Sequence, residues 1–226
     1  MDLNIIKEII APNTMCSQEQ VIELDELLEE VFENKIDGDI VECGTWRGGL
    51  ACLIVQHIIK NIKADKKVYI YDTFEGMPEP EPEDVGVQGE KAIDTFNRWK
   101  RKDGTSSKWC SSGIEFVESN LNRITENYKI YTNLIKGKVE DTLLIKENLP
   151  KKICLMRLDT DWYRSTKIEL ETFYPMLSTG GIVIIDDYNH WLGQQKAVNE
   201  FLDGLEWESF ETVIGANAGL IIRKLK

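Results

Sequence analysis

Two short stretches of the sequence place pairs of acidic residues at the ends of apolar runs. In "RLDTDWYRST", Asp159 and Asp161 follow such a run, and in "GGIVIIDDYNHW", Asp186 and Asp187 do the same. Bare carboxylates at the ends of buried strands are costly unless a positive charge lies beside them. Sets of oxygen ligands are typical of Mg²⁺ sites, which keep places for water or substrate oxygens. The four acids therefore predict a divalent-cation site, with helix capping as the alternative for one or two of them.

A second group of residues suits a nucleoside that carries a positive charge. In "VECGTWRGG", Gly44 permits a sharp strand-to-helix turn, but the stretch lacks both the G-x-G-x-x-G of a dinucleotide site and the Gly-Lys of a P-loop. Glu42, just before that turn, disfavours a phosphate, and Asp72 stands where an acid can accept both ribose hydroxyls. S-adenosylmethionine is the common cofactor that fits. The alternative is an ordinary tight turn and a surface acid.

Three further residues lie close to the acid pairs in the sequence. His190 follows Asp187 by three residues, and is either an acid–base group or substrate contact, or simply a loop residue. Trp162 and Trp191 flank the acid pairs, so we expect them to pack on a ligand or on a closing segment.

Hydrophobic periodicity predicts the elements that position these residues. Apolar residues between 17 and 32 recur on one helix face, and Ser17 and Gln20 are spaced as a capping box. Largely apolar strands then alternate with helices, the pattern of a parallel sheet covered on both faces. The expected strands span 38–44, 66–72, 129–136, 152–158 and 181–185, and the expected helices span 46–62, 113–127, 165–177 and a stretch from about 191.

The end of the chain and one internal segment depart from this alternation. The runs "ESFETVIG" and "AGLIIRKL" predict an antiparallel hairpin, which makes a doubly wound, mostly parallel α/β sheet of seven strands. Because ligands of open α/β sheets bind at the carboxyl ends of the strands, the acids should converge there. Residues 75–112 hold half of the prolines and many charges, so we expect a lid that is mobile or ordered only over a ligand.

Length and composition limit the kind of protein. The 226 residues fit a single domain over 1–226 with an N-terminal helical arm (1–37), and the net charge of −12 disfavours nucleic acid and anionic membranes as partners. The five cysteines form no CxxC pair and indicate a reduced, intracellular protein. The N-terminus lacks a basic region typical of a signal peptide, and no apolar run approaches the ~18 residues of a membrane span. We therefore expect a cytoplasmic protein.

Six motifs in this order resemble the macrocin O-methyltransferase family over residues 13 to 203. They are "GDIVECGTWRGG", "YDTFEGMP", "FNRW", "GKVEDTL", "RLDTDWYRST" and "GGIVIIDDYNHWLGQQKAVNEF". Members of that family are metal-dependent class I methyltransferases, with a Rossmann-like fold, that use S-adenosylmethionine to methylate sugar hydroxyls of natural products. The segment from 77 to 112 matches the family's lid, although "RKDGTSSKWCSS" does not match cleanly.

The resemblance implies a role for individual residues. Asp159, Asp186 and Asp187 match the ligands of Mg²⁺ or a similar divalent cation, and Asp161 matches a further acid in the substrate pocket. Thr14 and Met15 match a pair that closes over the cofactor, and the chain begins close to it, so we expect a short substrate-binding arm. The full set of residues implied to bind S-adenosylmethionine is Thr14, Met15, Glu42, Gly44, Asp72, Thr73, Phe74, Gly76, Val139 and Glu140.

The expected reaction is transfer of a methyl group to a hydroxyl, in which the cation lowers the pKa of that hydroxyl. Asp161 is the first candidate for the base that accepts the proton, followed by Asp159 and His190. Three alternatives stay open: a catechol-type methyltransferase acting on phenols, an Asp-x-Asp glycosyltransferase, and a non-catalytic relative. The acceptor is expected to be a small molecule with a sugar hydroxyl, and the resemblance is compatible with a homo-oligomer.

Overall fold

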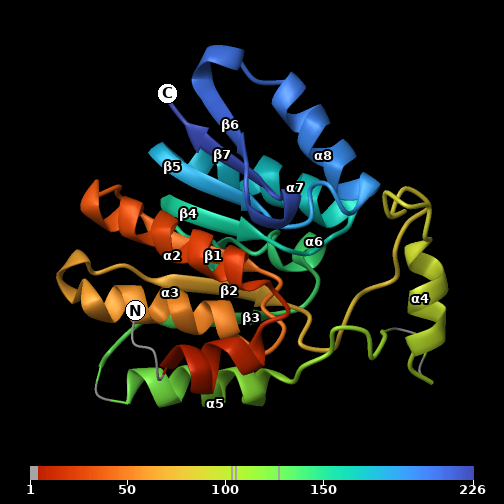
Figure 1. Cartoon of the computed structure of the whole chain (residues 1–226), viewed down its shortest axis with the longest axis horizontal. Helices are drawn as coiled ribbons and strands as arrows, with labels where there is room; N and C mark the ends of the chain where they lie inside the picture. Colours follow the sequence, from red (N-terminus) through yellow and green to blue (C-terminus); the bar gives the residue numbers. More distant parts are fainter. Residues whose placement is uncertain (1–4, 103, 105, 127) are drawn as a thin grey trace.

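One seven-stranded sheet carries helices on both faces (Figure 1). The computed structural model describes residues 5–102, 104, 106–126 and 128–226. The strand order is β3-β2-β1-β4-β5-β7-β6. The strands are Asp39–Cys43 (β1), Val68–Asp72 (β2), Thr132–Lys136 (β3), Ile153–Leu158 (β4), Leu177–Ile185 (β5), Phe210–Ile214 (β6) and Leu220–Lys224 (β7).

The direction of the strands confirms the predicted sheet. Strands β1 to β5 pair in parallel, whereas β7 is antiparallel to both β5 and β6. The chain adds β2 and β3 on one side of β1, then returns to place β4 and β5 on the other side. This reversal lies between β1 and β4, and such switch points are where ligands of open α/β sheets bind.

Helices cover the two faces of the sheet in separate groups. The helices α2 (Gln18–Glu33), α3 (Gly49–Lys60) and α5 (Ile114–Thr125) pack on one face, and α6 (Val139–Thr142), α7 (Tyr163–Phe173) and α8 (Leu192–Asp203) pack on the other. Successive side chains of a strand point to opposite faces, so Ile40 joins the first core while Val41 and Cys43 join the second. Helices cover both faces of the central strands, which explains why β1, β2, β4 and the end of β5 are largely apolar and buried.

The N-terminal arm reaches the sheet through α2. The Ser17 side chain accepts the Gln20 amide, and the Gln20 side chain accepts the Ser17 amide, which confirms the predicted capping box. The turn Ile6–Ile10 precedes α2 and buries Ile9 and Ile10 in the core beside α3. Within the described residues, none of the helices combines the length and hydrophobicity that crossing a bilayer requires.

Some boundaries differ from the prediction for local reasons. The helix expected over 165–177 runs from Tyr163 to Phe173, because Pro175 follows in a tight turn (Tyr174–Met176) and cannot continue a helix. As a result β5 starts at Leu177, four residues earlier than expected. The helix expected over 113–127 ends at Thr125, and position 127 lies outside the described residues.

The lid segment, residues 75–112, has more regular structure than its composition predicts. It contains the helix α4 (Ala92–Trp99), which stands at the right of Figure 1, away from the sheet. The helix forms because its apolar side buries Ala92 and Phe96. Isolated backbone bridges join Val85 to Lys91, Lys100 to Ser107 and, outside the lid, Gly86 to Trp191. The described part of the lid therefore contains a helix and backbone bridges, one of which joins it to the body of the protein.

Candidate active site

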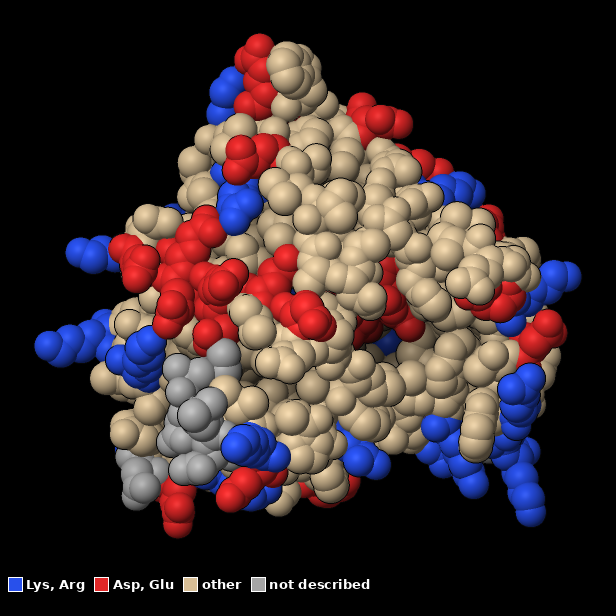
Figure 2. All heavy atoms as spheres, viewed as in Figure 1, with Lys and Arg blue, Asp and Glu red and all other residues tan. Residues whose placement is uncertain are grey.

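A cavity of about 300 Å³ opens at the carboxyl ends of the strands beside the switch point. Gly44, Asp72, Asp159 and Asp186, which follow or end β1, β2, β4 and β5, line its floor. Residues of the lid and of the N-terminal arm complete its walls. Figure 2 shows this face hollowed between the body and the lid, with acidic side chains at the rim of the hollow. The predicted convergence of the acids at one edge of the sheet is confirmed.

Asp72 organises the backbone on the β1 and β2 side of the cavity. One carboxylate oxygen accepts the amides of Thr45 (2.8 Å) and Trp46 (3.1 Å), and the other accepts the amide of Phe74 (2.7 Å). Gly44 has φ +80°, and a Cβ there would overlap the carbonyl oxygen of Asp159. Glycine is thus required, because the β1 and β4 ends touch at this point.

Arg157 is a buried positive charge beneath the acids. Its guanidinium lies 2.7 Å from Asp159 Oδ2, 3.0 Å from Asp186 Oδ2 and 3.5 Å from Glu42 Oε1, while its side chain is 3% exposed. Burial opposes its charge, but the carboxylates of Asp159 and Asp186 raise the pKa of Arg157 well above its usual range. Burial also raises the pKa of Glu42 to about 7, against the effect of Arg157. Arg157 therefore supplies part of the positive charge that the acids require.

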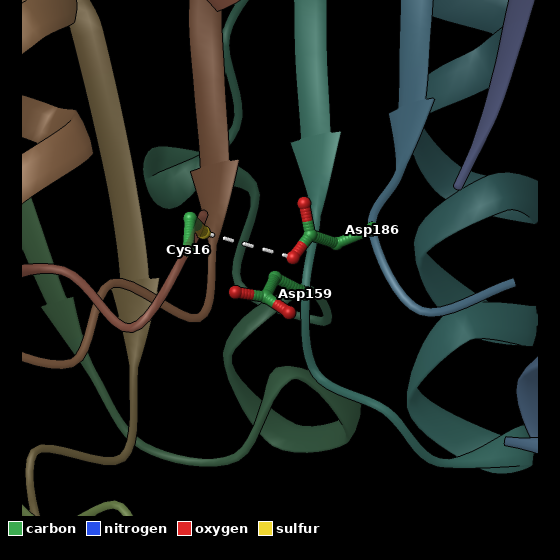
Figure 3. A group of neighbouring side chains, drawn as sticks. All are labelled: Cys16, Asp159 and Asp186. Carbon is green, nitrogen blue, oxygen red and sulfur yellow. Dashed lines mark hydrogen bonds between the residues drawn. The ribbon is translucent and has the colours of Figure 1, made fainter. Parts of the chain in front are cut away.

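Asp186 connects this cluster to the N-terminal arm. Figure 3 shows Cys16, Asp159 and Asp186 meeting from three segments of the chain, with Cys16 Sγ 3.8 Å from Asp186 Oδ2. The Gln20 side chain donates to the same oxygen at 3.1 Å, and Arg157 donates to Cys16 Sγ at 3.1 Å. The side chains of Cys16, Asp159 and Asp186 lie close enough for a metal, but the guanidinium of Arg157 contacts all three.

The remaining acids form a group that faces the cavity. One oxygen each of Asp159, Asp161 and Asp187 lies within 4.8 Å of the others, a spacing that suits a divalent cation. Burial raises the pKa of Asp159 and of Asp161 well above the usual range, and repulsion from Asp187 adds to the rise for both. Burial and the charge of Asp186 raise the pKa of Asp187 as well. Three carboxylate oxygens at this spacing, of which Arg157 contacts only the residue Asp159, fit a hard cation such as Mg²⁺.

The turn that carries Asp161 is held from behind by a buried acid. Thr160 Oγ1 lies 2.9 Å and 3.1 Å from the two oxygens of Glu169, which is fully buried on α7. Burial raises the pKa of Glu169 to about 8. Asp161 itself has φ +68°, a left-handed conformation that Asp tolerates better than most residues. The turn therefore depends on contacts from the helix that follows it.

Three tryptophans join the lid to the acid-bearing side of the cavity. Trp109 of the lid packs on Trp162 and Trp191, with ring centroids 5.5 Å and 6.1 Å apart. Trp162 and Trp191 are 5.1 Å apart and almost fully buried. Trp162 and Trp191 therefore pack against the segment 75–112, through Trp109.

A comparison with protein-family models finds one match that spans most of the chain. Residues 10–208 match the model described as macrocin-O-methyltransferase (TylF). The chain belongs to the macrocin O-methyltransferase family. The resemblance drawn from the sequence motifs is therefore confirmed.

Curated O-methyltransferases align with a large part of the chain. A demethyldecarbamoylnovobiocin O-methyltransferase from Streptomyces niveus is 30% identical over 194 residues, which cover 84% of this chain and 67% of that protein. A tetracenomycin-type rhamnosyl 4'-O-methyltransferase from Streptomyces olivaceus is 32% identical over 180 residues, covering 78% and 62%. A mycinamicin III 3''-O-methyltransferase from Micromonospora griseorubida is 28% identical, and 65% of it is covered. The chain thus spans about two thirds of these relatives' length.

Solved structures agree with this assignment. The O-methyltransferase NovP is 27% identical, with a TM-score of 0.74 over 95% of this chain and 83% of that one. The calicheamicin methyltransferase CalS11, at 19% identity and a TM-score of 0.68, covers 96% of this chain and 83% of its own, and shows the shared fold alone. The seven-stranded mixed sheet is therefore the class I methyltransferase fold.

Most of the site residues that the sequence predicted lie together at the cavity. Those that line it are Met15, Gly44, Asp72, Thr73, Gly76, Val139, Glu140, Asp159, Asp161, Asp186, Asp187 and His190. Thr14, Glu42 and Phe74 do not. The Thr14 hydroxyl accepts the Cys16 amide in a local turn, Glu42 is fully buried beside Arg157, and Phe74 packs into the core.

The structure also divides the predicted metal ligands. Asp159 and Asp187 come together with Asp161, and Asp159 also contacts Arg157, as Asp186 does. Sequence reasoning missed Arg157, Cys16 and Gln20 as neighbours of the site. The signal for Arg157 was present, because it is the one basic residue inside the apolar run "ICLMRL".

Proposed function

We propose that this protein is an S-adenosylmethionine-dependent O-methyltransferase that uses a divalent cation and methylates a sugar hydroxyl of a natural product. The observation that carries the proposal is the group formed by Asp159, Asp161 and Asp187 at the wall of the cavity, in a fold whose family performs this chemistry. The names of the curated relatives, which describe O-methylation of glycosylated antibiotics or their precursors, support the sugar acceptor.

Each part of the cavity is assigned a role. The backbone around Gly44 and the turn held by Asp72 would bind S-adenosylmethionine, with Val139 and Glu140 on the adenine side. Asp159 and Asp187 would hold the cation. When bound, S-adenosylmethionine would supply the methyl group, and the cation would supply the positive charge that lowers the pKa of the acceptor hydroxyl.

Asp161 is the proposed base, because it lines the cavity and its carboxylate lies beside those of Asp159 and Asp187. An acceptor hydroxyl bound to the cation would lie next to this carboxylate. Asp161 would accept the proton of the acceptor hydroxyl as that oxygen takes the methyl group, while the carbon–sulfur bond of the donor breaks and S-adenosylhomocysteine leaves. The lid and the tryptophans exclude water from this step and fix the acceptor, which contributes to the rate by orientation.

The test is a methyl-transfer assay on the full chain with labelled S-adenosylmethionine. The acceptor panel should contain nucleotide sugars, glycosylated antibiotics lacking one methyl group, and catechols. We expect transfer to a sugar acceptor in Mg²⁺ and its loss in EDTA, with recovery when Mg²⁺ is restored. Binding of S-adenosylhomocysteine, followed by calorimetry, reports on the cofactor site independently of the acceptor.

The variant Asp161→Asn removes the proposed base and keeps the size of the side chain nearly the same. We expect its turnover to fall at least ~100-fold while its affinity for S-adenosylhomocysteine stays within about twofold of wild type. Asp141→Asn, an exposed acid on α6, is the matched control and should keep full turnover. Methylation that survives EDTA would contradict the cation's role, and full turnover of Asp161→Asn would contradict the base.

A further inference from the structure

The lid contains one buried carboxylate that none of the roles above uses. Asp84 is 2% exposed, although it belongs to the charged stretch "EPEPEDVG". Its Oδ1 accepts the backbone amide of Tyr163 at 2.9 Å, and its Oδ2 accepts the amide of Glu81 at 2.7 Å. Burial raises the pKa of Asp84, and these two hydrogen bonds act against that rise. A buried acid of this kind is retained only where its contacts offset the cost of burial.

Asp84 lies at the first turns of two helices of the body. Tyr163, whose amide it accepts, is the first residue of α7. Gly193 is the second residue of α8, and a Cβ at that position would overlap Asp84 Oδ1. The amides at a helix N-terminus favour a negative charge, and this one carboxylate of the lid accepts an amide at the start of α7 and lies against the start of α8.

The backbone beside Asp84 also follows the body of the protein. The amide of Val87 donates to the carbonyl of His190 at 2.9 Å, and the amide of Leu192 donates to the carbonyl of Val85 at 2.9 Å. Within the lid, the amide of Ala92 donates to the carbonyl of Asp84 at 3.1 Å, which ties α4 to the same point. The lid is thus docked along residues 190–192.

The helices α7 and α8, whose first turns lie beside Asp84, each follow a pair of the acids that line the cavity. Residues 159–163 carry Asp159 and Asp161 into α7, and residues 186–193 carry Asp186 and Asp187 into α8. We call them the acid-bearing segments. The two segments follow different strands, β4 and β5, so contacts of both with Asp84 help to fix their relative position.

We propose that Asp84 is a positioning residue that docks the lid and holds the two acid-bearing segments at the distance the cation site requires. The docking role follows from the contacts alone, whereas the effect on the cation rests on the proposed function. The supporting contacts of a metal site typically change metal affinity about 10- to 100-fold when removed. Asp84 would act in this way from the lid.

The test compares Asp84→Asn with the matched control Glu83→Gln, which removes a charge from the exposed neighbouring position and with it a solvent-exposed ion pair to Lys196 (3.7 Å), a kind of pair that contributes little. Three measurements are made on the full chain: hydrogen exchange of individual amides, Mn²⁺ affinity by electron paramagnetic resonance, and affinity for S-adenosylhomocysteine by calorimetry. Gly193→Ala serves as a second variant, because its Cβ displaces the Asp84 carboxylate from the other side.

We expect Asp84→Asn and Gly193→Ala to speed exchange at the amides of Tyr163, Val87 and Leu192 at least ~10-fold, with no change at Leu28 in α2. Mn²⁺ affinity should fall ~10-fold, and affinity for S-adenosylhomocysteine should change less than about twofold. The control should match wild type throughout.

Wild-type exchange at these amides in both variants would overturn the docking role. An equal loss of affinity for Mn²⁺ and for S-adenosylhomocysteine would overturn the positioning role, since it would indicate general loosening. Failure of the wild type to bind either probe would contradict the proposed function instead, and the exchange measurements would still decide whether Asp84 docks the lid.

Discussion

At the scale of single residues, the site is a problem of charge balance. Five carboxylates, those of Glu42, Asp159, Asp161, Asp186 and Asp187, gather around the switch point, and Arg157 contacts three of them. The guanidinium can form this fork because it is planar and offers several N–H donors in fixed directions. It leaves Asp161 and Asp187, with the second oxygen of Asp159, facing the cavity.

Removing Arg157 should therefore lower the free energy of unfolding more than removing a surface arginine does. We expect Arg157→Met to lower the free energy of unfolding by about 3–5 kcal/mol, because Glu42 and Asp186 then stay buried without a counter-charge. Urea denaturation at neutral pH measures the loss. The exposed Arg123→Met on α5 is the control, and an equal effect of the two substitutions would contradict the buried role of Arg157.

The chemistry of these residues was more predictable from the sequence than their partners. Runs of apolar residues that end in Asp72, Asp159 and Asp186 mark strand ends, and parallel strands bring such ends together. The pairing of Asp186 with Arg157 and Gln20 depends on side-chain directions across three elements. Periodicity does not predict such contacts, which is why the sequence pointed to a cation or to helix capping and not to Arg157.

At the scale of elements, the close approach of two strand ends determines the shape of the site. The turn after β1 passes so near the end of β4 that only glycine fits at Gly44. The same turn is fixed from β2 by Asp72, whose carboxylate accepts three backbone amides. The sequence showed a tight turn here, but the contact with Asp159 joins residues more than a hundred positions apart.

Substitution at Gly44 can separate backbone strain from this contact. Gly180 has almost the same φ (+79° against +80°), yet a Cβ there would meet only Ile36 at an ordinary 3.7 Å. We expect Gly180→Ala to cost about 1–3 kcal/mol from its left-handed conformation, and Gly44→Ala to cost clearly more. Thermal and urea denaturation give both values. Equal losses would show that the approach of Asp159 is relaxed easily.

At the scale of the whole molecule, buried acids make the stability depend on pH. The pKa of Glu169 is about 8 in the folded protein, against 4.5 for an ordinary Glu. Between these values the folded state binds more protons than the unfolded state, so the free energy of unfolding falls as pH rises. This one group contributes a decrease of up to about 1.4 kcal/mol per pH unit across that window.

Glu169→Gln should remove this contribution and keep an acceptor for Thr160. We expect the difference in stability between the variant and the wild type to shift in favour of the variant as pH rises from 5 to 8. Urea denaturation at three pH values measures the shift. Glu171→Gln, exposed on the same helix, should run parallel to wild type, and an unchanged slope in Glu169→Gln would contradict the buried charge.

The connection between β2 and β3 has a consequence for how such proteins diversify. These strands pair directly, and α5 alone completes the crossover between them, so α4 and the remainder of the lid are surplus to the architecture of the sheet. An insertion of this kind can be exchanged between homologues by recombination without altering any pairing of strands. Under the proposed function, we expect the lid to be able to change its contacts with an acceptor while Asp72, Asp159 and Asp187 keep their places at the strand ends.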